Sequence, residues 1–252
     1  MQTNLDLTNI FSGAVPPILF LDFDGTVSKR DVIDAILEEF ADERWLEVEQ
    51  EWVDGKIGSR ECLRRQFDLV RARPCVMDDF LSGFDLDNGI VSILDICDEA
   101  RIPVHIASDG FEYYIRRMLM KEVADKEKVR NIGIWANLLK PVGDDLWSTD
   151  FPHMKDVCGD GCATCKPAVM RHENRFAAPT IFVGDGLSDR FAAQTADSVF
   201  AKQKLADYCR QNQIAFNQYD DLQQVAESLR RAYESAAVHR SWGLQQLELN
   251  PA

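Results

Sequence analysis

Three short apolar runs mark the chain, and each stops at a polar or charged residue with glycine close behind it. They span residues 17–22, 103–108 and 180–184. Continuous apolar runs of this length are typical of strands buried on both faces of a parallel sheet. Ligands bind at the carboxyl ends of the strands in open α/β sheets. The pattern therefore predicts three strand ends that meet at one crevice.

Helical spacing of apolar residues fills the intervals between and after these runs. Because strands and helices alternate, the sequence predicts the α/β class, with right-handed crossovers and a Rossmann-like parallel sheet flanked by helices. The predicted helices span residues 88–100, 112–120, 166–171, 189–194 and 220–235.

An inserted segment separates the first two predicted strands. Roughly eighty residues lie between them, and a βαβ unit needs far fewer for its single crossover helix. We interpret residues 29–87 as a helical cap over the crevice, and residues 1–28 and 88–236 as the core. The predicted cap helices span residues 32–40, 45–52 and 59–70.

Two smaller segments lie outside this scheme. Residues 131–151 alternate apolar and polar positions on either side of residues 141–145, a pattern that predicts a β-hairpin. Residues 237–252 have no clear pattern, and we expect a mobile tail there.

The charge and cysteine content of the chain restrict its partners. With 42 acidic and 28 basic residues, the net charge is -14, which repels nucleic acid phosphates and anionic membranes. The apolar run at residues 15–21 contains two prolines and is too short to cross a bilayer. Seven cysteines, an odd number, favour reduced thiols over a disulfide framework. We therefore expect a cytoplasmic enzyme with neither a nucleic acid nor a membrane partner.

An aspartate pair ends the first run, where Asp22 and Asp24 lie in the sequence Asp-Phe-Asp-Gly-Thr. A carboxylate that attacks phosphorus needs a metal to hold it against an anionic substrate, and a second acid to protonate the leaving alkoxide. Asp22 suits the first role and Asp24 the second. An Asp-Gly turn or a calcium loop would look similar, but a calcium loop needs further oxygen ligands at alternate positions.

Two more aspartates, Asp185 and Asp189, follow the third run. Mg²⁺ keeps several waters and needs only one or two carboxylates. We therefore expect Asp22 and Asp185 as direct ligands, with Asp189 orienting a ligand water. The alternative is an acidic loop that caps the next helix.

Phosphate-binding groups are predicted at two helix starts. Ser108, Asp109 and Gly110 end the second run just before a predicted helix, so the hydroxyl and the backbone N–H groups can cradle a phosphate. Lys166 begins another helix, where a fixed ammonium neutralises phosphate oxygens. A serine cap and a surface lysine are the ordinary alternatives.

Four elements follow in chain order: the Asp22/Asp24 pair, Ser108, Lys166 and the Asp185/Asp189 pair. Together they resemble the ordered motifs of the haloacid dehalogenase superfamily. The resemblance implies an aspartyl-phosphate intermediate on Asp22, with Asp24 as acid and base. It also implies Mg²⁺ bound by Asp22, by the backbone carbonyl of Asp24 and by Asp185, while Ser108 and Lys166 bind the phosphoryl group. It covers the chain from about residue 16 to residue 236. The cap position is similar to that of the phosphoserine-phosphatase-like branch, whose members act on small phosphorylated metabolites.

Two segments, residues 162–167 and 182–193, most resemble the methionine-salvage phosphatases that act on 2-hydroxy-3-keto-5-methylthiopentenyl-1-phosphate. Phosphoserine phosphatases are the alternative. In those enzymes an acidic residue nine positions after the nucleophile meets the substrate amine, and Asp31 stands there.

The cap and the second motif depart from the phosphoserine phosphatase pattern. In phosphoserine phosphatases a cap arginine holds the substrate carboxylate, and Gln66 occupies the corresponding position here. Arg64 or Arg65 could replace that arginine by a shift of one helical step. The second motif is usually Ser-Gly-Gly, whereas Asp109 stands here. Its side chain must point away from the phosphate or meet a cation.

A cysteine cluster precedes Lys166. His153, Cys158, Cys162 and Cys165 have spacings compatible with a tetrahedral structural zinc site. The alternative is a set of reduced, partly buried thiols.

Three classes of function remain open from the sequence. The first is a Mg²⁺-dependent phosphomonoester hydrolase. A phosphotransferase or mutase would share the aspartyl-phosphate but pass the group to another hydroxyl. A non-catalytic regulatory protein is the third, although every catalytic position is filled. The oligomeric state stays open.

Overall fold

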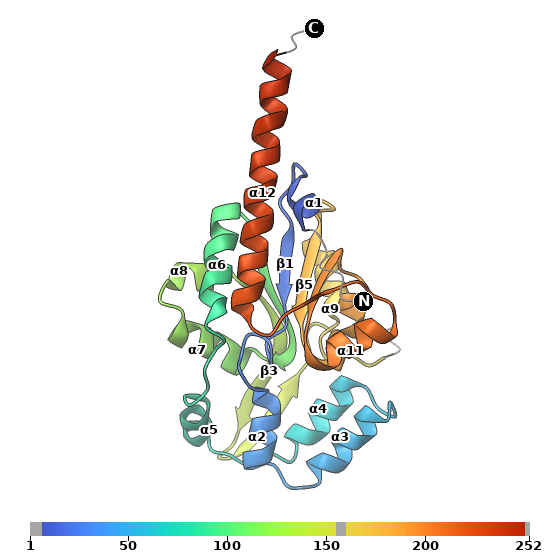
Figure 1. Cartoon of the computed structure of the whole chain (residues 1–252). Coiled ribbons are helices and arrows are strands. Elements are labelled where there is room, and N and C mark those ends of the chain that lie inside the picture. The colour runs from blue at the N-terminus through green and yellow to red at the C-terminus, as the bar shows by residue number, and fades with distance from the viewer. Residues whose placement is uncertain (1–6, 155–159, 250–252) are drawn as a thin grey trace.

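One sheet runs through the centre of the molecule (Figure 1). Within residues 7–154 and 160–249, the part of the chain that this computed structural model describes, seven strands take the order β4-β3-β2-β1-β5-β6-β7. All neighbouring pairs are parallel except β3 and β4, which form an antiparallel hairpin. The strands are β1 (Ile18–Leu21), β2 (Val104–Phe111), β3 (Gly133–Val142), β4 (Leu146–Asp150), β5 (Thr180–Gly184), β6 (Ser198–Ala201) and β7 (Asn217–Gln218).

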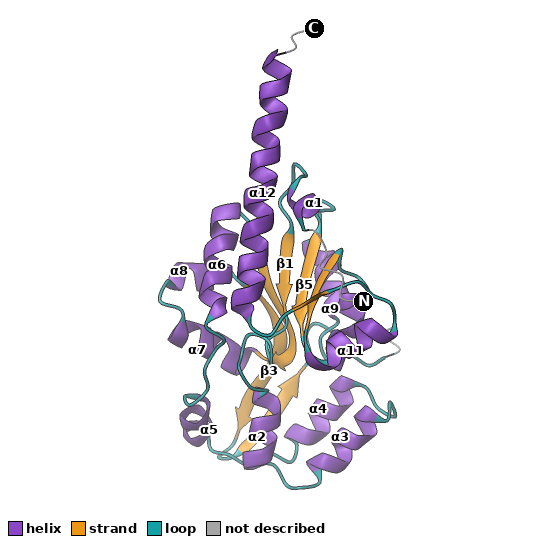
Figure 2. Cartoon of the chain, in the orientation of Figure 1, coloured by secondary structure: helices purple, strands orange, loops and turns teal. Residues whose placement is uncertain are grey.

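Helices cover both faces of this sheet, as the apolar runs predict (Figure 2). Leu19 and Leu21 of β1 are buried in the core on one face with the helices α6, α7 and α12. Ile18 and Phe20 are buried on the other face with α9, α10 and α11. The α/β prediction is therefore confirmed. These helices are α6 (Gly89–Ala100), α7 (Glu112–Glu122), α9 (Lys166–Glu173), α10 (Arg190–Ala193), α11 (Gln203–Gln211) and α12 (Leu222–Leu249).

Four helices form the cap beyond the carboxyl ends of the parallel strands (Figure 1). The two connections between core and cap lie side by side, because Ser28 and Leu86 form an antiparallel bridge. The boundaries of the cap as a separate domain stay a prediction. The cap helices are α2 (Val32–Phe40), α3 (Trp45–Val53), α4 (Ser59–Phe67) and α5 (Pro74–Leu81).

The predicted hairpin is present as β3 and β4, and it reaches from the sheet to the cap. The indole Nε1 of Trp147 donates to the carbonyl of Ala72 at 2.9 Å. The N–H of Ala72 donates to the carbonyl of Asp145 at 3.0 Å. These bonds join the hairpin directly to the cap segment between α4 and α5.

Several elements differ from the sequence prediction. α4 ends at Phe67 instead of residue 70, because Val70 pairs with Ala41 in a β-bridge. β6 and β7 were not predicted, since β6 is a run of only four residues and β7 consists of two polar residues. The helices α5 and α11 were missed as well, although α11 buries Leu205, Ala206 and Cys209 at helical spacing. α12 continues to Leu249, where no regular structure was expected; Gln, Glu and Leu are good helix formers there. The shorter helices are α1 (Thr8–Phe11), α8 (Lys126–Arg130) and the 3₁₀ turn η1 (Leu187–Asp189).

None of the helices in these described ranges combines the length and the apolar character that a membrane span requires.

Candidate active site

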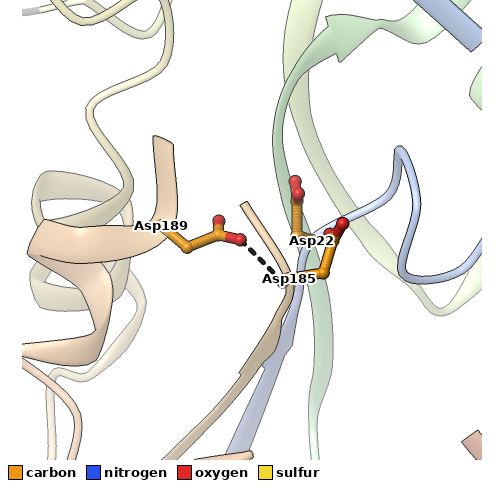
Figure 3. A group of neighbouring side chains, drawn as sticks. All are labelled: Asp22, Asp185 and Asp189. Carbon is orange, nitrogen blue, oxygen red and sulfur yellow. Dashed lines mark hydrogen bonds between the residues drawn. The ribbon is translucent and has the colours of Figure 1, made fainter. Parts of the chain in front are cut away.

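Three aspartates meet at the ends of two adjacent strands. β1 and β5 are parallel neighbours with Leu21 opposite Val183, so the residues that follow them emerge side by side. Asp22, Asp185 and Asp189 each offer a carboxylate oxygen, and these oxygens lie within 4.8 Å of one another (Figure 3). The topology of the sheet thus assembles an acidic cluster from two distant parts of the sequence.

This cluster fits a magnesium ion by its chemistry, because its donors are all carboxylate oxygens. Asp189 is already engaged: its Oδ2 accepts the N–H groups of Asp185 and Gly186, both at 3.0 Å, and its Oδ1 accepts from Lys166. Among the described residues, Asp22 and Asp185 each accept a bond on Oδ1 only, from Lys166 and from Thr26. They therefore remain the predicted direct ligands and Asp189 the predicted support. The backbone carbonyl of Asp24 stays a predicted ligand.

Gly25 lets the chain pass close to this cluster. Its φ of 73° lies in the left-handed region, which residues with a side chain rarely adopt. A Cβ atom at this position would lie 2.5 Å from Oδ2 of Asp185. A side chain here would therefore displace a carboxylate of the candidate metal site.

Lys166 is the buried cation of the site. Its side chain is only 1% exposed, and Nζ lies 2.8 Å from Oδ1 of Asp22 and also contacts Asp189. Burial opposes the charge, but the carboxylates of Asp189 and Asp22 outweigh it, so the pKa of Lys166 is raised. The ammonium therefore remains charged beside the expected nucleophile.

The crowded carboxylates are poorly stabilised without a metal. Burial raises the pKa of Asp22 well above its ordinary value, Asp189 adds to the effect, and Lys166 opposes it. Burial and the charge of Asp189 raise the pKa of Asp185 to about 6. A divalent cation would favour the ionised form of both groups.

Asp24 is held separately from the acidic cluster. Its Oδ2 accepts from the phenol of Tyr114 at 2.7 Å, and its Oδ1 accepts from the backbone N–H of Val32 at 3.2 Å. Burial raises the pKa of Asp24 to about 6, while the bond from Tyr114 lowers it. Tyr114 was not singled out from the sequence, because a tyrosine inside an amphipathic helix carries no motif.

Ser108, Asp109 and Gly110 lie opposite this group at the end of β2. The hydroxyl of Ser108 accepts the N–H of Gly110 at 2.9 Å and lies 3.4 Å from Oδ2 of Asp24. Asp109 turns its Oδ1 to the backbone N–H of Thr164, at 2.8 Å. Burial raises the pKa of Asp109, and the charge of Lys166 counteracts the rise. Its extra carboxylate is thus hydrogen-bonded to the loop that leads into Lys166.

A cavity of about 290 Å³ lies between these residues and the cap. Its floor is formed by Asp22, Asp24, Asp185 and the Ser108–Gly110 segment, and its roof by residues of α2, α3 and α4. The volume is close to the lower end of small-molecule pockets. The site is therefore sized for a small ligand whose reacting group lies against the aspartates.

No protein-family model matches the sequence. Curated relatives named 2-hydroxy-3-keto-5-methylthiopentenyl-1-phosphate phosphatase do match. The one from Bacillus pumilus is 26% identical over 81% of this chain and 87% of its own length. The one from Geobacillus thermodenitrificans is 27% identical over 85% of this chain and 96% of its own length.

Solved structures show the same fold. A phospho-aspartyl intermediate analogue of phosphoserine phosphatase has a TM-score of 0.65 and 18% identity, over 84% of this chain and 97% of that chain. A substrate-bound phosphoserine phosphatase has a TM-score of 0.64 and 19% identity, over 84% and 98%. A Salmonella enterica hydrolase of the haloacid dehalogenase family has a TM-score of 0.64 and 17% identity, over 83% and 69%.

The chain is similar to phosphatases of the haloacid dehalogenase superfamily in its motifs and its fold. Its four ordered motifs meet at one crevice of the expected sheet, and the curated phosphatases match it over most of their own length. It is a phosphatase, in the class of phosphoric monoester hydrolases.

Two cap arginines of this phosphatase lie outside the cavity. Arg64 pairs with Glu61 and Asp68 on the outer surface, and Arg65 pairs with Glu51. Neither lines the cavity, whereas Cys62, Leu63 and Gln66 do. The structure therefore brings neither arginine to the cavity, and a contact of either one with the substrate stays a prediction. The reason is helical phase, because positions 62, 63 and 66 share one face of α4 and positions 64 and 65 face away from it.

The zinc prediction for this phosphatase stays untested, because Cys158 lies outside the described residues. Among the residues that are described, the three aspartates form the only group of three or more metal-binding side chains close enough to share an ion. The N–H of Cys165 donates to the carbonyl of His153 at 3.0 Å, and the His153 ring packs edge-on against Trp135. Metal analysis of protein purified without chelator or a polyhistidine tag tests the prediction; less than one zinc per chain contradicts it.

Replacing Asp185 by asparagine is expected to flatten the pH dependence of stability in the metal-free protein. The folded protein keeps a proton on Asp185 up to about pH 6, whereas the ordinary pKa is 3.8. The folded state therefore binds more protons in this window, and the free energy of unfolding falls as pH rises from about 4 to about 6. We expect that fall to be smaller in Asp185→Asn by about 2–3 kcal/mol, since one pKa unit is about 1.4 kcal/mol.

Urea unfolding in chelator across this pH window measures the difference. Asp95→Asn is the matched control, because the Asp95 carboxylate is 54% exposed on the surface and does not line the cavity. Equal pH slopes for wild type and Asp185→Asn would show that this carboxyl does not titrate as the structure indicates.

Proposed function

We propose that this chain is a Mg²⁺-dependent phosphomonoester hydrolase that forms an aspartyl-phosphate on Asp22. The substrate is a small phosphorylated metabolite, and the methionine-salvage enol phosphate is the best match. One observation carries the proposal. Asp22 lines the floor of the cavity, and its carboxylate lies beside the Lys166 ammonium and the carboxylates of Asp185 and Asp189. A buried carboxylate with a fixed cation beside it suits attack on an anionic phosphoryl group.

The residues divide the reaction into two displacements. A carboxylate oxygen of Asp22 attacks phosphorus while the proton of Asp24 passes to the leaving oxygen. Water then attacks the phosphoryl group on Asp22 and gives its proton to Asp24. Lys166, the Ser108 hydroxyl and nearby backbone N–H groups hold the phosphoryl oxygens. Bound Mg²⁺, held by Asp22 and Asp185, supplies positive charge that offsets the repulsion between carboxylate and phosphate.

The cap side of the cavity disfavours a substrate carboxylate. Gln66, at the position of the arginine in phosphoserine phosphatases, is buried and donates its amide to Oε2 of Glu49 at 3.0 Å. Glu49 lines the cavity together with Asp31 and Asp34. At this position a substrate carboxylate would therefore lie beside acidic side chains, where those enzymes offer a cation.

The name of the enol phosphate describes a leaving group with hydroxy, keto and methylthio groups and no carboxylate. Ile33, Trp52 and Leu63 supply apolar cap surface that suits a methylthio tail. The curated relatives that carry this substrate in their name support the same choice. Phosphoserine is the weaker candidate, because its amine can meet Asp31 but its carboxylate finds Gln66 where those enzymes have the arginine; Lys29 and Lys204 are the cations that line the cavity beside the aspartates.

Replacing Glu49 by glutamine is expected to raise kcat/KM for phosphoserine, relative to an uncharged alkyl phosphate, by about fivefold to tenfold. Removing one like charge in a partly solvated pocket is worth on the order of 1 kcal/mol. Glu51→Gln is the matched control, because Glu51 lies on the same helix but pairs with Arg65 outside the cavity. An unchanged preference in Glu49→Gln would show that this carboxylate does not face the leaving group.

Phosphate release from a panel of phosphorylated metabolites, with and without Mg²⁺, tests the proposed function. Release that needs Mg²⁺ and no acceptor alcohol supports a hydrolase and excludes a phosphotransferase or mutase. A panel without any Mg²⁺-dependent turnover would favour a regulatory protein instead. The cytoplasmic location expected from the cysteines stays a prediction.

A further inference from the structure

Tyr114 is a fully buried tyrosine whose hydroxyl reaches the candidate active site. It lies on α7, outside the four motifs, and donates to Oδ2 of Asp24 at 2.7 Å. Its ring packs against Phe23 and Phe111, with ring centroids 5.9 and 6.4 Å away. Aromatic neighbours on two sides leave the phenol little freedom to turn away. Its position relative to Asp24 is therefore set by the core.

Gly110 covers the same carboxylate oxygen from another side. A Cβ atom on Gly110 would collide both with Oδ2 of Asp24 and with the hydroxyl of Tyr114. The backbone of the second motif therefore lies directly against this hydrogen bond. Oδ2 is enclosed by Gly110, Tyr114 and the Ser108 hydroxyl, which is 3.4 Å away.

The other oxygen of Asp24 has a different environment. Oδ1 accepts one bond, from the backbone N–H of Val32 at 3.2 Å, and Asp24 lines the cavity. At 2.7 Å from a carboxylate oxygen the phenol is the donor of this bond, so Oδ2 is the acceptor.

We propose that Tyr114 is a positioning residue for the acid–base step, because its hydroxyl holds Oδ2 of Asp24 and leaves Oδ1 to carry the transferred proton. The proposal rests on the proposed function, in which Asp24 is the acid and base. In the first displacement the proton leaves Oδ1 for the leaving-group oxygen as its bond to phosphorus breaks. In the second, water returns a proton to Oδ1 as its oxygen bonds to phosphorus.

Leaving-group dependence separates this role from a structural one. An alkoxide is a poor leaving group and needs the proton from Asp24, whereas 4-nitrophenolate leaves without it. A misplaced Asp24 therefore slows alkyl phosphate hydrolysis far more than it slows the release of 4-nitrophenolate in the first turnover, before the phosphoenzyme has to be hydrolysed. A general loss of packing would slow both substrates alike.

Tyr114→Phe keeps the ring and removes only the hydroxyl. We expect kcat for an alkyl phosphate to fall about tenfold to a hundredfold, within the range of acid–base contributions, and the rate of the first-turnover burst of 4-nitrophenolate to fall less than about threefold. KM for both substrates should change little. Tyr113→Phe is the matched control, because the neighbouring hydroxyl bonds to Asp78 at the surface.

Equal losses for both substrates, or no loss for either, would overturn the proposal. In the double variant Asp24→Asn/Tyr114→Phe an amide replaces the buried carboxylate that loses its hydrogen bond. This variant therefore remains informative if Tyr114→Phe alone folds poorly. The proposal predicts that it hydrolyses the alkyl phosphate no more slowly than Asp24→Asn alone, and a further tenfold loss would contradict it. Wild-type protein without Mg²⁺-dependent phosphate release would instead reject the proposed function.

Discussion

Replacing Asp22 by asparagine is expected to lower kcat for an aryl phosphate by a factor on the order of 10³ or more, since the nucleophile is lost. The amide has nearly the same shape as the carboxylate, and Lys166 keeps its contact with Asp189. The fold should therefore survive, with little change in the thermal midpoint. Initial rates of phosphate release at saturating Mg²⁺ measure the loss.

Asp98→Asn is the matched control for this variant. Its carboxylate is 72% exposed on α6, so the same chemical change there should leave the rate within about twofold, as surface substitutions usually do. Activity of Asp22→Asn near the wild-type level would rule out covalent catalysis by this residue.

Replacing Lys166 by methionine is expected to cost about 3–5 kcal/mol of stability in metal-free protein, because removal of one partner leaves buried charge uncompensated. Its side chain is 1% exposed and contacts both Asp22 and Asp189. Activity should fall as well, by about 10² or more, as for loss of other groups that stabilise transition-state charge. Denaturant unfolding in chelator measures the first effect and phosphate release the second.

Lys121→Met supplies the surface comparison, because Lys121 is 48% exposed and pairs with Glu122. It should change stability by less than about 0.5 kcal/mol. Adding Asp189→Asn to Lys166→Met should recover part of the lost stability, since one of the stranded charges is removed. A loss in Lys166→Met no larger than in Lys121→Met would mean that the buried ion pairs do not form in solution.

The sequence was most informative where chemistry coincides with strand ends. Asp22 and Asp185 each follow a continuous apolar run, and the ends of adjacent parallel strands must emerge together. Their juxtaposition could thus be predicted without any knowledge of side-chain packing. The fold class followed from the same alternation of buried strands and amphipathic helices.

The cap was harder to interpret because function there depends on helical phase. A step of one residue on α4 moves a side chain by about 100° around the axis, which separates Gln66, in the cavity, from Arg65 on the outer surface. Tyr114 posed a different problem: its bond to Asp24 spans 90 positions and depends on tertiary packing. Contacts of this kind leave no local pattern in the sequence.

The aspartyl-phosphate on Asp22 is tested most directly in the Asp24→Asn variant with an aryl phosphate. Formation of the phosphoenzyme from a good leaving group needs no acid, but its hydrolysis needs the base, so the intermediate should accumulate. Acid quench and borohydride reduction then convert an aspartyl-phosphate to homoserine, which mass spectrometry locates. Our account predicts homoserine at position 22, approaching one per chain and dependent on substrate. No homoserine, or homoserine at another aspartate, would contradict it.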